Sequence, residues 1–150
     1  MGEALITRRG IEDGLDVLGN DPNRGDSYQC AGTYTPGPSE LTLSNGATRT
    51  VKSFVYMDSN KNLVRCANLD FIILYMQGTA SSKYWYYTAK INLGETKYVE
   101  PVDGYEMNIT LDRDTTDSTE SYSITITATN NTGSHSQIYR PYSYIYVGSN

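Results

Sequence analysis

The chain has 150 residues, of which 38% are hydrophobic and 19% are charged, and its formal net charge is −5. This length predicts one domain with at most a short appendage. The scattered basic residues do not fit a nucleic-acid-binding protein, and no apolar run approaches the roughly 20 residues that cross a bilayer. The first ten residues lack the apolar stretch of a signal peptide. We therefore expect no nucleic-acid or membrane partner, and synthesis in the cytoplasm.

Residues 1–27 differ in composition from the rest of the chain. They contain five glycines, and their three basic residues are outnumbered by six acidic ones. Ile11, Leu15 and Leu18 are spaced as on one face of a short helix, although a helix of this length is marginal in isolation. We predict that residues 1–27 form an extended arm that becomes ordered only when it docks.

From Tyr28 onward the hydrophobic period becomes two, which is typical of strands with one buried face. The clearest alternation runs over 122–129 and 105–112, and the other expected strands are 28–34, 40–44, 48–57, 62–67, 69–76, 83–92 and 137–147. Asn45-Gly46 is the strongest hairpin signal, and Asp103-Gly104 is a further turn signal. Many short strands without a convincing helix predict an antiparallel β-sandwich or jelly-roll-like domain over residues 28–150.

The segment Leu69–Met76 is the one nearly continuous apolar run. It predicts a central strand that is covered on both faces or that lies at a subunit contact. The outward faces of the other expected strands are rich in Ser, Thr and Asn and poor in Lys, so their edges are weakly protected. Oligomerisation is one way to cover such edges, and we expect a homo-oligomer.

Two cysteines, Cys30 and Cys66, allow two interpretations. They are either small buried hydrophobes within strands or a single disulfide, whose loop closure would contribute about 3–4 kcal/mol. The sequence leaves both open.

Few residues carry the signature of catalysis or metal binding. The only histidine, His135, falls in a loop and has no evident partner. The segment 58–62 resembles the start of a calcium loop but lacks its glycine, and the aspartates of 112–117 are equally typical of turns. Arg24-Gly25-Asp26 matches an integrin-type tripeptide that arises often by chance. We expect no catalytic site, no bound metal and no cofactor, so the chain is not expected to be an enzyme.

Aromatic side chains form two clusters. On one expected strand, Tyr84 and Tyr86 point to one face, and Trp85 and Tyr87 to the other. On the last strand, three tyrosines share a face: Tyr142, Tyr144 and Tyr146. These rings are either core residues and cross-strand pairs or a surface for a sugar or a protein partner.

The segment Ala4-Leu5-Ile6-Thr7-Arg8-Arg9-Gly10 resembles the opening of small tail and other virion proteins of phages and prophages of Gram-positive gut bacteria. In those proteins, such a segment precedes a variable, Tyr- and Thr-rich β domain. The resemblance implies a structural protein of the particle, synthesised in the bacterial cytoplasm and located in the virion. It implies that other virion proteins are its partners and that Leu5, Ile6, Thr7, Arg8, Arg9 and Gly10 dock to the particle.

Two functions follow as hypotheses. The first is a non-enzymatic virion structural protein, of tail, fibre or capsid-decoration type, whose β domain points outward and contacts a host-surface glycan or protein. Analogy with fibres and decoration proteins suggests a trimer. The second is a carbohydrate-binding module that uses the exposed Tyr and Trp side chains. A small hydrolase would need His135.

Overall fold

The computed structural model describes residues 30–35, 40–80, 82–116 and 121–150. The predicted arm of residues 1–27, including Leu5 to Gly10 and Arg24-Gly25-Asp26, lies outside this part of the chain. The described residues form strands joined by turns and loops, which confirms the all-β prediction. No helix among them has the length and apolar character needed to span a membrane.

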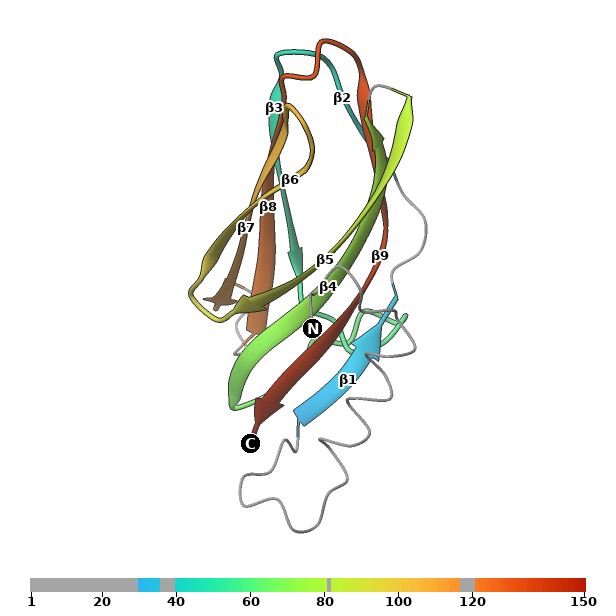
Figure 1. Cartoon of the computed structure of the whole chain (residues 1–150). Coiled ribbons are helices and arrows are strands. Elements are labelled where there is room, and N and C mark those ends of the chain that lie inside the picture. Colours follow the sequence, from blue (N-terminus) through green and yellow to red (C-terminus); the bar gives the residue numbers. More distant parts are fainter. Residues whose placement is uncertain (1–29, 36–39, 81, 117–120) are drawn as a thin grey trace.

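The strands form two antiparallel sheets that face each other as a sandwich (Figure 1). Sheet A has the order β1-β9-β4-β5, and β2 also pairs with β9. Sheet B has the order β3-β8-β7-β6. The strands of sheet A are β1 (Cys30–Tyr34), β2 (Glu40–Leu43), β4 (Asn68–Ala80), β5 (Lys83–Asn92) and β9 (Ser136–Ser149). Those of sheet B are β3 (Thr48–Phe54), β6 (Thr96–Val102), β7 (Tyr105–Asp114) and β8 (Ser121–Asn130).

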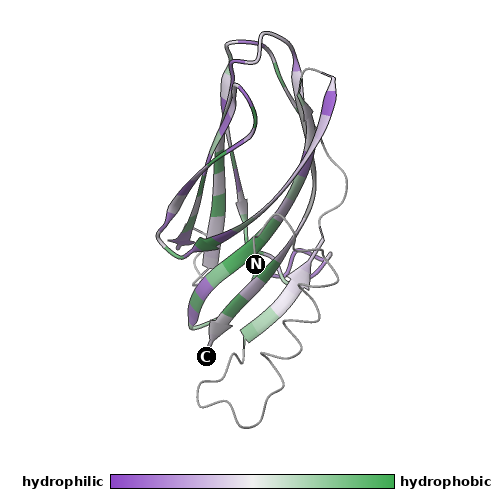
Figure 2. Ribbon diagram, viewed as in Figure 1, coloured by the Kyte–Doolittle hydropathy of each residue, from purple (hydrophilic) through white to green (hydrophobic). Residues whose placement is uncertain are grey.

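The core lies between the sheets because each strand turns its apolar set inward. On β7 and β8, Met107, Ile109 and Ile124 are almost fully buried, as the alternation over 105–112 and 122–129 predicts. Strand β4 lies in the centre of sheet A between β9 and β5, as expected for the apolar run. Its inward side chains Ile72 and Leu74 are buried, and Figure 2 shows hydrophobic bands along its lower part.

Tyr144 on β9 also points into this core. Its hydroxyl accepts the backbone N–H of Tyr56 at 2.6 Å and donates to the carbonyl of the same residue at 2.9 Å. Tyr146, two residues further on, is buried above Gly32 on β1. A Cβ atom at Gly32 would lie 2.7 Å from Cζ of Tyr146, so a glycine is needed for this ring to pack. Tyr144 thus fits the core because its hydroxyl finds backbone partners there.

The turn at Asn45-Gly46 is present, but the hairpin predicted from it is wrong. Gly46 has a φ of +79°, and the N–H of Ala47 bonds to the carbonyl of Ser44 at 3.0 Å. However, β2 before the turn belongs to sheet A, whereas β3 after it belongs to sheet B. The turn carries the chain from one layer to the other, since β2 pairs with β9 and β3 with β8.

Two further strand predictions need correction. Residues 62–67 form no strand, and Leu63 makes only an isolated bridge to Tyr56. Strand β6, in contrast, was not expected. It forms an edge of sheet B, where Pro101 is tolerated because an edge position needs no ladder N–H.

Cys30 and Cys66 form a disulfide, which resolves the choice left open by the sequence. It ties β1, at the edge of sheet A, to the loop that precedes β4. The 36-residue separation implies about 4 kcal/mol of stabilisation from loop closure. The same loop is held by Tyr122, whose buried hydroxyl accepts the N–H of Leu69 at 3.1 Å and donates to the carbonyl of Cys66 at 3.2 Å.

Candidate functional site

The outer face of sheet B is polar and satisfied by its own side chains. Three pairs of facing threonines on it are joined by hydrogen bonds of 2.9–3.0 Å: Thr48–Thr129, Thr50–Thr127 and Thr96–Thr110. On β6, the Tyr98 hydroxyl donates to Glu106 at 2.9 Å and lies 3.2 Å from a carboxylate oxygen of Glu100. These contacts, above all that with Glu106, raise the pKa of Tyr98 to about 12. Such a face is well suited to water.

The outer face of sheet A carries apolar side chains instead. Ile145 and Val147 on β9 alternate with the core tyrosines and therefore point away from sheet B, where they pack with Phe71 and Ile73 of β4. We call these four residues the outer cluster. Its β9 members are almost fully buried, and its β4 members are half-buried. On the neighbouring strand, the Nζ atom of Lys90 lies 4.3 Å from the centre of the Phe71 ring.

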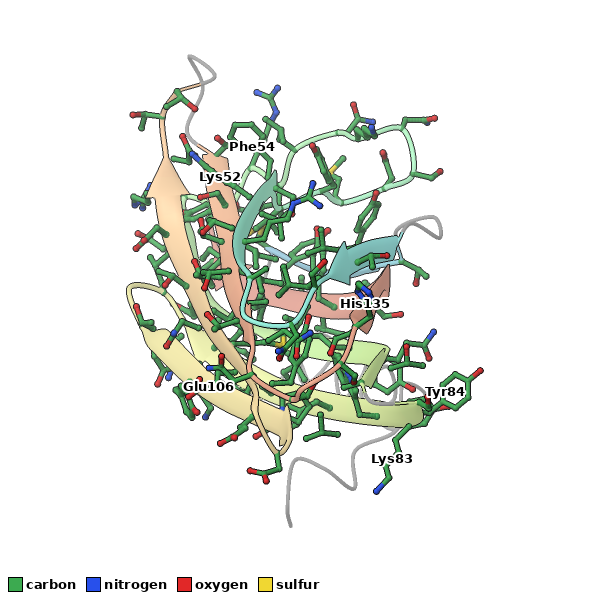
Figure 3. The ribbon with its side chains drawn as sticks, turned by 90° about the horizontal axis from the view of Figure 1, so that it is seen from above. Lys52, Phe54, Lys83, Tyr84, Glu106 and His135 are labelled. Atoms are coloured by element: carbon green, nitrogen blue, oxygen red, sulfur yellow. A yellow bond between two sulfur atoms is a disulfide. The ribbon has the colours of Figure 1, made fainter. Side chains whose placement is uncertain are left out.

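Beyond the outer cluster, towards the β4–β5 turn, the same face becomes aromatic. Tyr84 and Tyr86 are 72% and 62% exposed, and with Gln77 and Gly78 they line a hollow of about 220 Å³. We call these four residues the tyrosine pocket. Figure 3 shows Tyr84 projecting from β5 away from the body of the sandwich. Gln77 pairs with Tyr86 in the sheet register, so the two side chains are neighbours on this face.

Tyr75 packs against one of the residues that line the tyrosine pocket. Its ring stacks on that of Tyr86 with centres 6.4 Å apart and planes 25° apart. Burial, with a smaller contribution from the Tyr86 phenol, raises the pKa of Tyr75. The stack therefore fixes one wall of the hollow, whereas Tyr84 at its rim is free of such a contact among the described rings.

Of the seven aromatic residues predicted as a ligand or partner surface, Tyr84 and Tyr86 are exposed, and Trp85, Tyr144 and Tyr146 are buried. Trp85 is 3% exposed and packs on Tyr105 with ring centres 6.0 Å apart, and Tyr87 is half-buried against the core. Tyr144 and Tyr146 are core residues, so their predicted place on a surface is wrong. The side chain of Tyr142 lies outside the described part. The alternation on β9 does hold, but the face that leaves the core is the aliphatic one.

The outer cluster was missed as a set, although the sequence holds its signal. Both faces of residues 143–147 are bulky, and the run at 69–76 is apolar on both sides. The pairing of Phe71 with Val147 and of Ile73 with Ile145 joins these two signals across 72–76 residues of sequence. That register is a long-range property that periodicity alone does not give.

The other candidate residues serve the fold in the positions described. Asp58 Oδ1 accepts the N–H groups of Asn60 and Asn62 at 3.0 and 3.2 Å, so this carboxylate caps its own loop. That hydrogen bonding, chiefly from the Asn62 side chain, lowers the pKa of Asp58. His135 is exposed in the loop between β8 and β9, as expected (Figure 3).

Asp114, at the end of β7, pairs with Lys52 of β3 and also accepts the hydroxyl and N–H of Thr116. These partners, Lys52 first, hold its pKa well below the usual range.

Within the described ranges, no three His, Cys, Asp or Glu side chains gather in a metal-binding group. The outer face of sheet A, with its cluster and its pocket, is therefore the candidate functional site. Comparisons of the chain with protein-family models, curated proteins and solved structures find no match.

Proposed function

We propose that this chain is a non-enzymatic structural protein of a bacteriophage particle that attaches through residues 1–27 and presents its sandwich outward. One observation carries the proposal: the outer face of sheet A holds the tyrosine pocket, whose Tyr84 and Tyr86 are the most exposed aromatic side chains among the described residues. Exposed apolar patches on soluble proteins are typical of interaction sites. The resemblance of Ala4–Gly10 to virion proteins supplies the class of assembly.

The disulfide supports the same assignment. Disulfides persist on virion surfaces and in other oxidising environments and are rare in the cytosol. Cys30–Cys66 fastens the strand that follows the proposed arm. A force applied through residues 1–27 would therefore reach the body at a covalently anchored strand, as suits a protein attached by its N-terminal segment.

The attachment itself is assigned to Leu5, Ile6, Thr7, Arg8, Arg9 and Gly10. Two adjacent guanidinium groups form bidentate bonds to carboxylates of a neighbouring virion protein, while Leu5 and Ile6 add apolar area. Repeated copies, in a homo-oligomer or around the particle, strengthen attachment by avidity.

Charge reversal of the two arginines tests the attachment. In a lysogen that carries the gene, the full chain with Arg8→Glu and Arg9→Glu is expected to fall at least tenfold in copies per purified particle, measured by quantitative mass spectrometry. The matched control is Arg24→Glu, which reverses a charge in the same segment outside the docking residues and should leave the copy number unchanged. Absence of the unaltered chain from purified particles would overturn the proposal.

A second candidate function, recognition of a carbohydrate, is favoured by the tyrosine pocket. Exposed aromatic rings beside an amide offer a stacking surface and a hydrogen-bonding group, which is what a sugar ring requires. The hollow of about 220 Å³ is small compared with drug-sized sites of about 300–1,000 Å³. It therefore suits one ring of a glycan.

A glycan array probed with the full chain tests this candidate. Binding of one glycan class, reduced at least tenfold by Tyr84→Ala and unchanged by Tyr98→Ala, is the expected result. Tyr98 is the matched control because it is an exposed tyrosine on the opposite sheet, 51% accessible. Equal loss in both variants, or no binding at all, would remove the candidate.

A further inference from the structure

Ile145 and Val147 are buried on the outer face of sheet A, which points away from sheet B. They point away from the inter-sheet core, yet they are only 3% and 1% exposed. Every described strand belongs to sheet A or sheet B, and sheet B packs on the opposite face. Their neighbours on β1 are Thr33 and Ala31, which are too small to cover them. None of the described strands therefore covers the outer cluster.

The chain outside the described strands supplies a matching segment. Residues 11–18 place Ile11, Leu15 and Leu18 at the spacing of one helical face. The segment precedes β1, whose Ala31 pairs with Val147, so the chain enters the sheet beside the outer cluster. The 12 residues from Leu18 to Cys30 span up to about 40 Å when extended, which is ample for the return.

Charge also favours this occupant. Residues 11–18 carry three carboxylates, those of Glu12, Asp13 and Asp16, and no basic group. The exposed cation beside the cluster is Lys90, whose Nζ atom already lies over Phe71. A segment that lays its apolar side on the cluster would bring the carboxylates of Glu12 and Asp16, at the flank of that side, nearer to this ammonium group than that of Asp13.

We propose that residues 11–18 dock on the outer cluster of their own chain, with Ile11, Leu15 and Leu18 against Phe71, Ile73, Ile145 and Val147. The docked segment fixes the direction in which Leu5 to Gly10 leave the body. It leaves the tyrosine pocket, further along the same face, open to a ligand. The inference concerns the isolated chain and does not depend on the proposed virion function.

A double-mutant cycle on the full chain tests the contact. Leu15→Ala and Ile73→Ala are each expected to lower the thermal midpoint by about 3–6 °C. Because residues in contact do not contribute independently, the double variant should lose clearly less than the sum of the two. The matched control is Asp13→Ala, on the opposite side of the segment, which should be additive with Ile73→Ala. Additive losses for Leu15 and Ile73 would overturn the proposal.

A photo-crosslink identifies the occupant directly. A benzophenone amino acid at position 15 should crosslink to peptides of β4 or β9 that contain the outer cluster, in a product with the mass of one chain. The same group at position 13 should not. A product with the mass of two chains would assign the face to a second copy, and crosslinks elsewhere would assign the segment to another site. Either result would contradict docking within one chain.

Discussion

The outer faces of sheet A and sheet B carry side chains of opposite character. Sheet B covers its outer surface with threonine pairs and a Tyr98–Glu106 contact, so its polar groups are satisfied among themselves and by water. Sheet A places a cluster of aliphatic and aromatic side chains there, followed by two exposed tyrosines. Since both faces belong to one small domain, the difference is not a property of the fold. Both proposals above rest on this difference, and both make sheet A the side that meets another segment or another molecule.

The largest expected effect concerns the edge of sheet A. Replacing both cysteines, Cys30→Ser with Cys66→Ser, should lower the free energy of unfolding by about 4 kcal/mol, because the unfolded chain regains the freedom of a 36-residue loop. Denaturant unfolding measures the loss. Hydrogen exchange should accelerate first in β1 and not in β3, an edge strand of sheet B. Equal acceleration in both edges would contradict the view that the disulfide serves sheet A.

One substitution on each outer face compares how much the two faces contribute to the free energy of unfolding. Ile145→Ala should cost about 2–3 kcal/mol of unfolding free energy even though the side chain points away from the core, because it is 3% exposed. Thr127→Ala, on the outer face of sheet B, should cost at most about 0.5–1 kcal/mol, since it removes one exposed hydrogen bond. Chemical denaturation of both variants gives the comparison. Similar losses of unfolding free energy in the two variants would contradict the view that the two outer faces differ in packing.

Two buried tyrosines, Tyr122 and Tyr105, differ in the hydrogen bonding of their hydroxyl groups. Tyr122→Phe should cost about 1–2 kcal/mol, because it leaves the buried N–H of Leu69 and the carbonyl of Cys66 without this partner. Tyr105→Phe should be neutral or slightly stabilising, because its buried hydroxyl has no hydrogen-bond partner among the described residues. Thermal unfolding compares the two variants, and a reversed order would contradict this assignment of partners.

The smallest effect is the pH dependence that Tyr98 contributes on sheet B. The folded-state pKa of Tyr98 is raised to about 12 from an ordinary value of 10. The contribution of this phenol to stability is therefore complete below pH 10 and is lost as the pH rises from 10 to 12. Tyr98→Phe should flatten the stability profile over that interval, measured by denaturation at each pH. The control Tyr84→Phe should leave the profile unchanged.

Much of the fold follows from local patterns in the sequence. The alternation of 105–112 and 122–129 places β7, β8 and their buried faces, and Asp103-Gly104 places the turn between β6 and β7, where Gly104 has a φ of +86°. Sheet membership does not follow in the same way. Asn45-Gly46 predicts a turn, but its type does not say whether the next strand stays in the same sheet.

The candidate site could be predicted only in part. Tyr84 and Tyr86 were expected on one face of their strand, opposite Trp85, and this alternation is confirmed. The sequence left open which face of β9 lies inward. Tyr144 bonds to the backbone of Tyr56, so the tyrosine face is the inner one, and Ile145 and Val147 lie on the outer face. Which face is inward depends on partners far along the chain.

The most direct test of the sheet A assignment is iodination of exposed tyrosines, read by peptide mass spectrometry. In the free chain, Tyr84 and Tyr86 on sheet A and Tyr98 on sheet B are all accessible, so each should be modified. On particles adsorbed to envelopes of their host bacterium, modification of Tyr84 and Tyr86 should fall at least fivefold while that of Tyr98 is unchanged. Protection of Tyr98 with continued modification of Tyr84 and Tyr86 would place the interacting face on the other sheet.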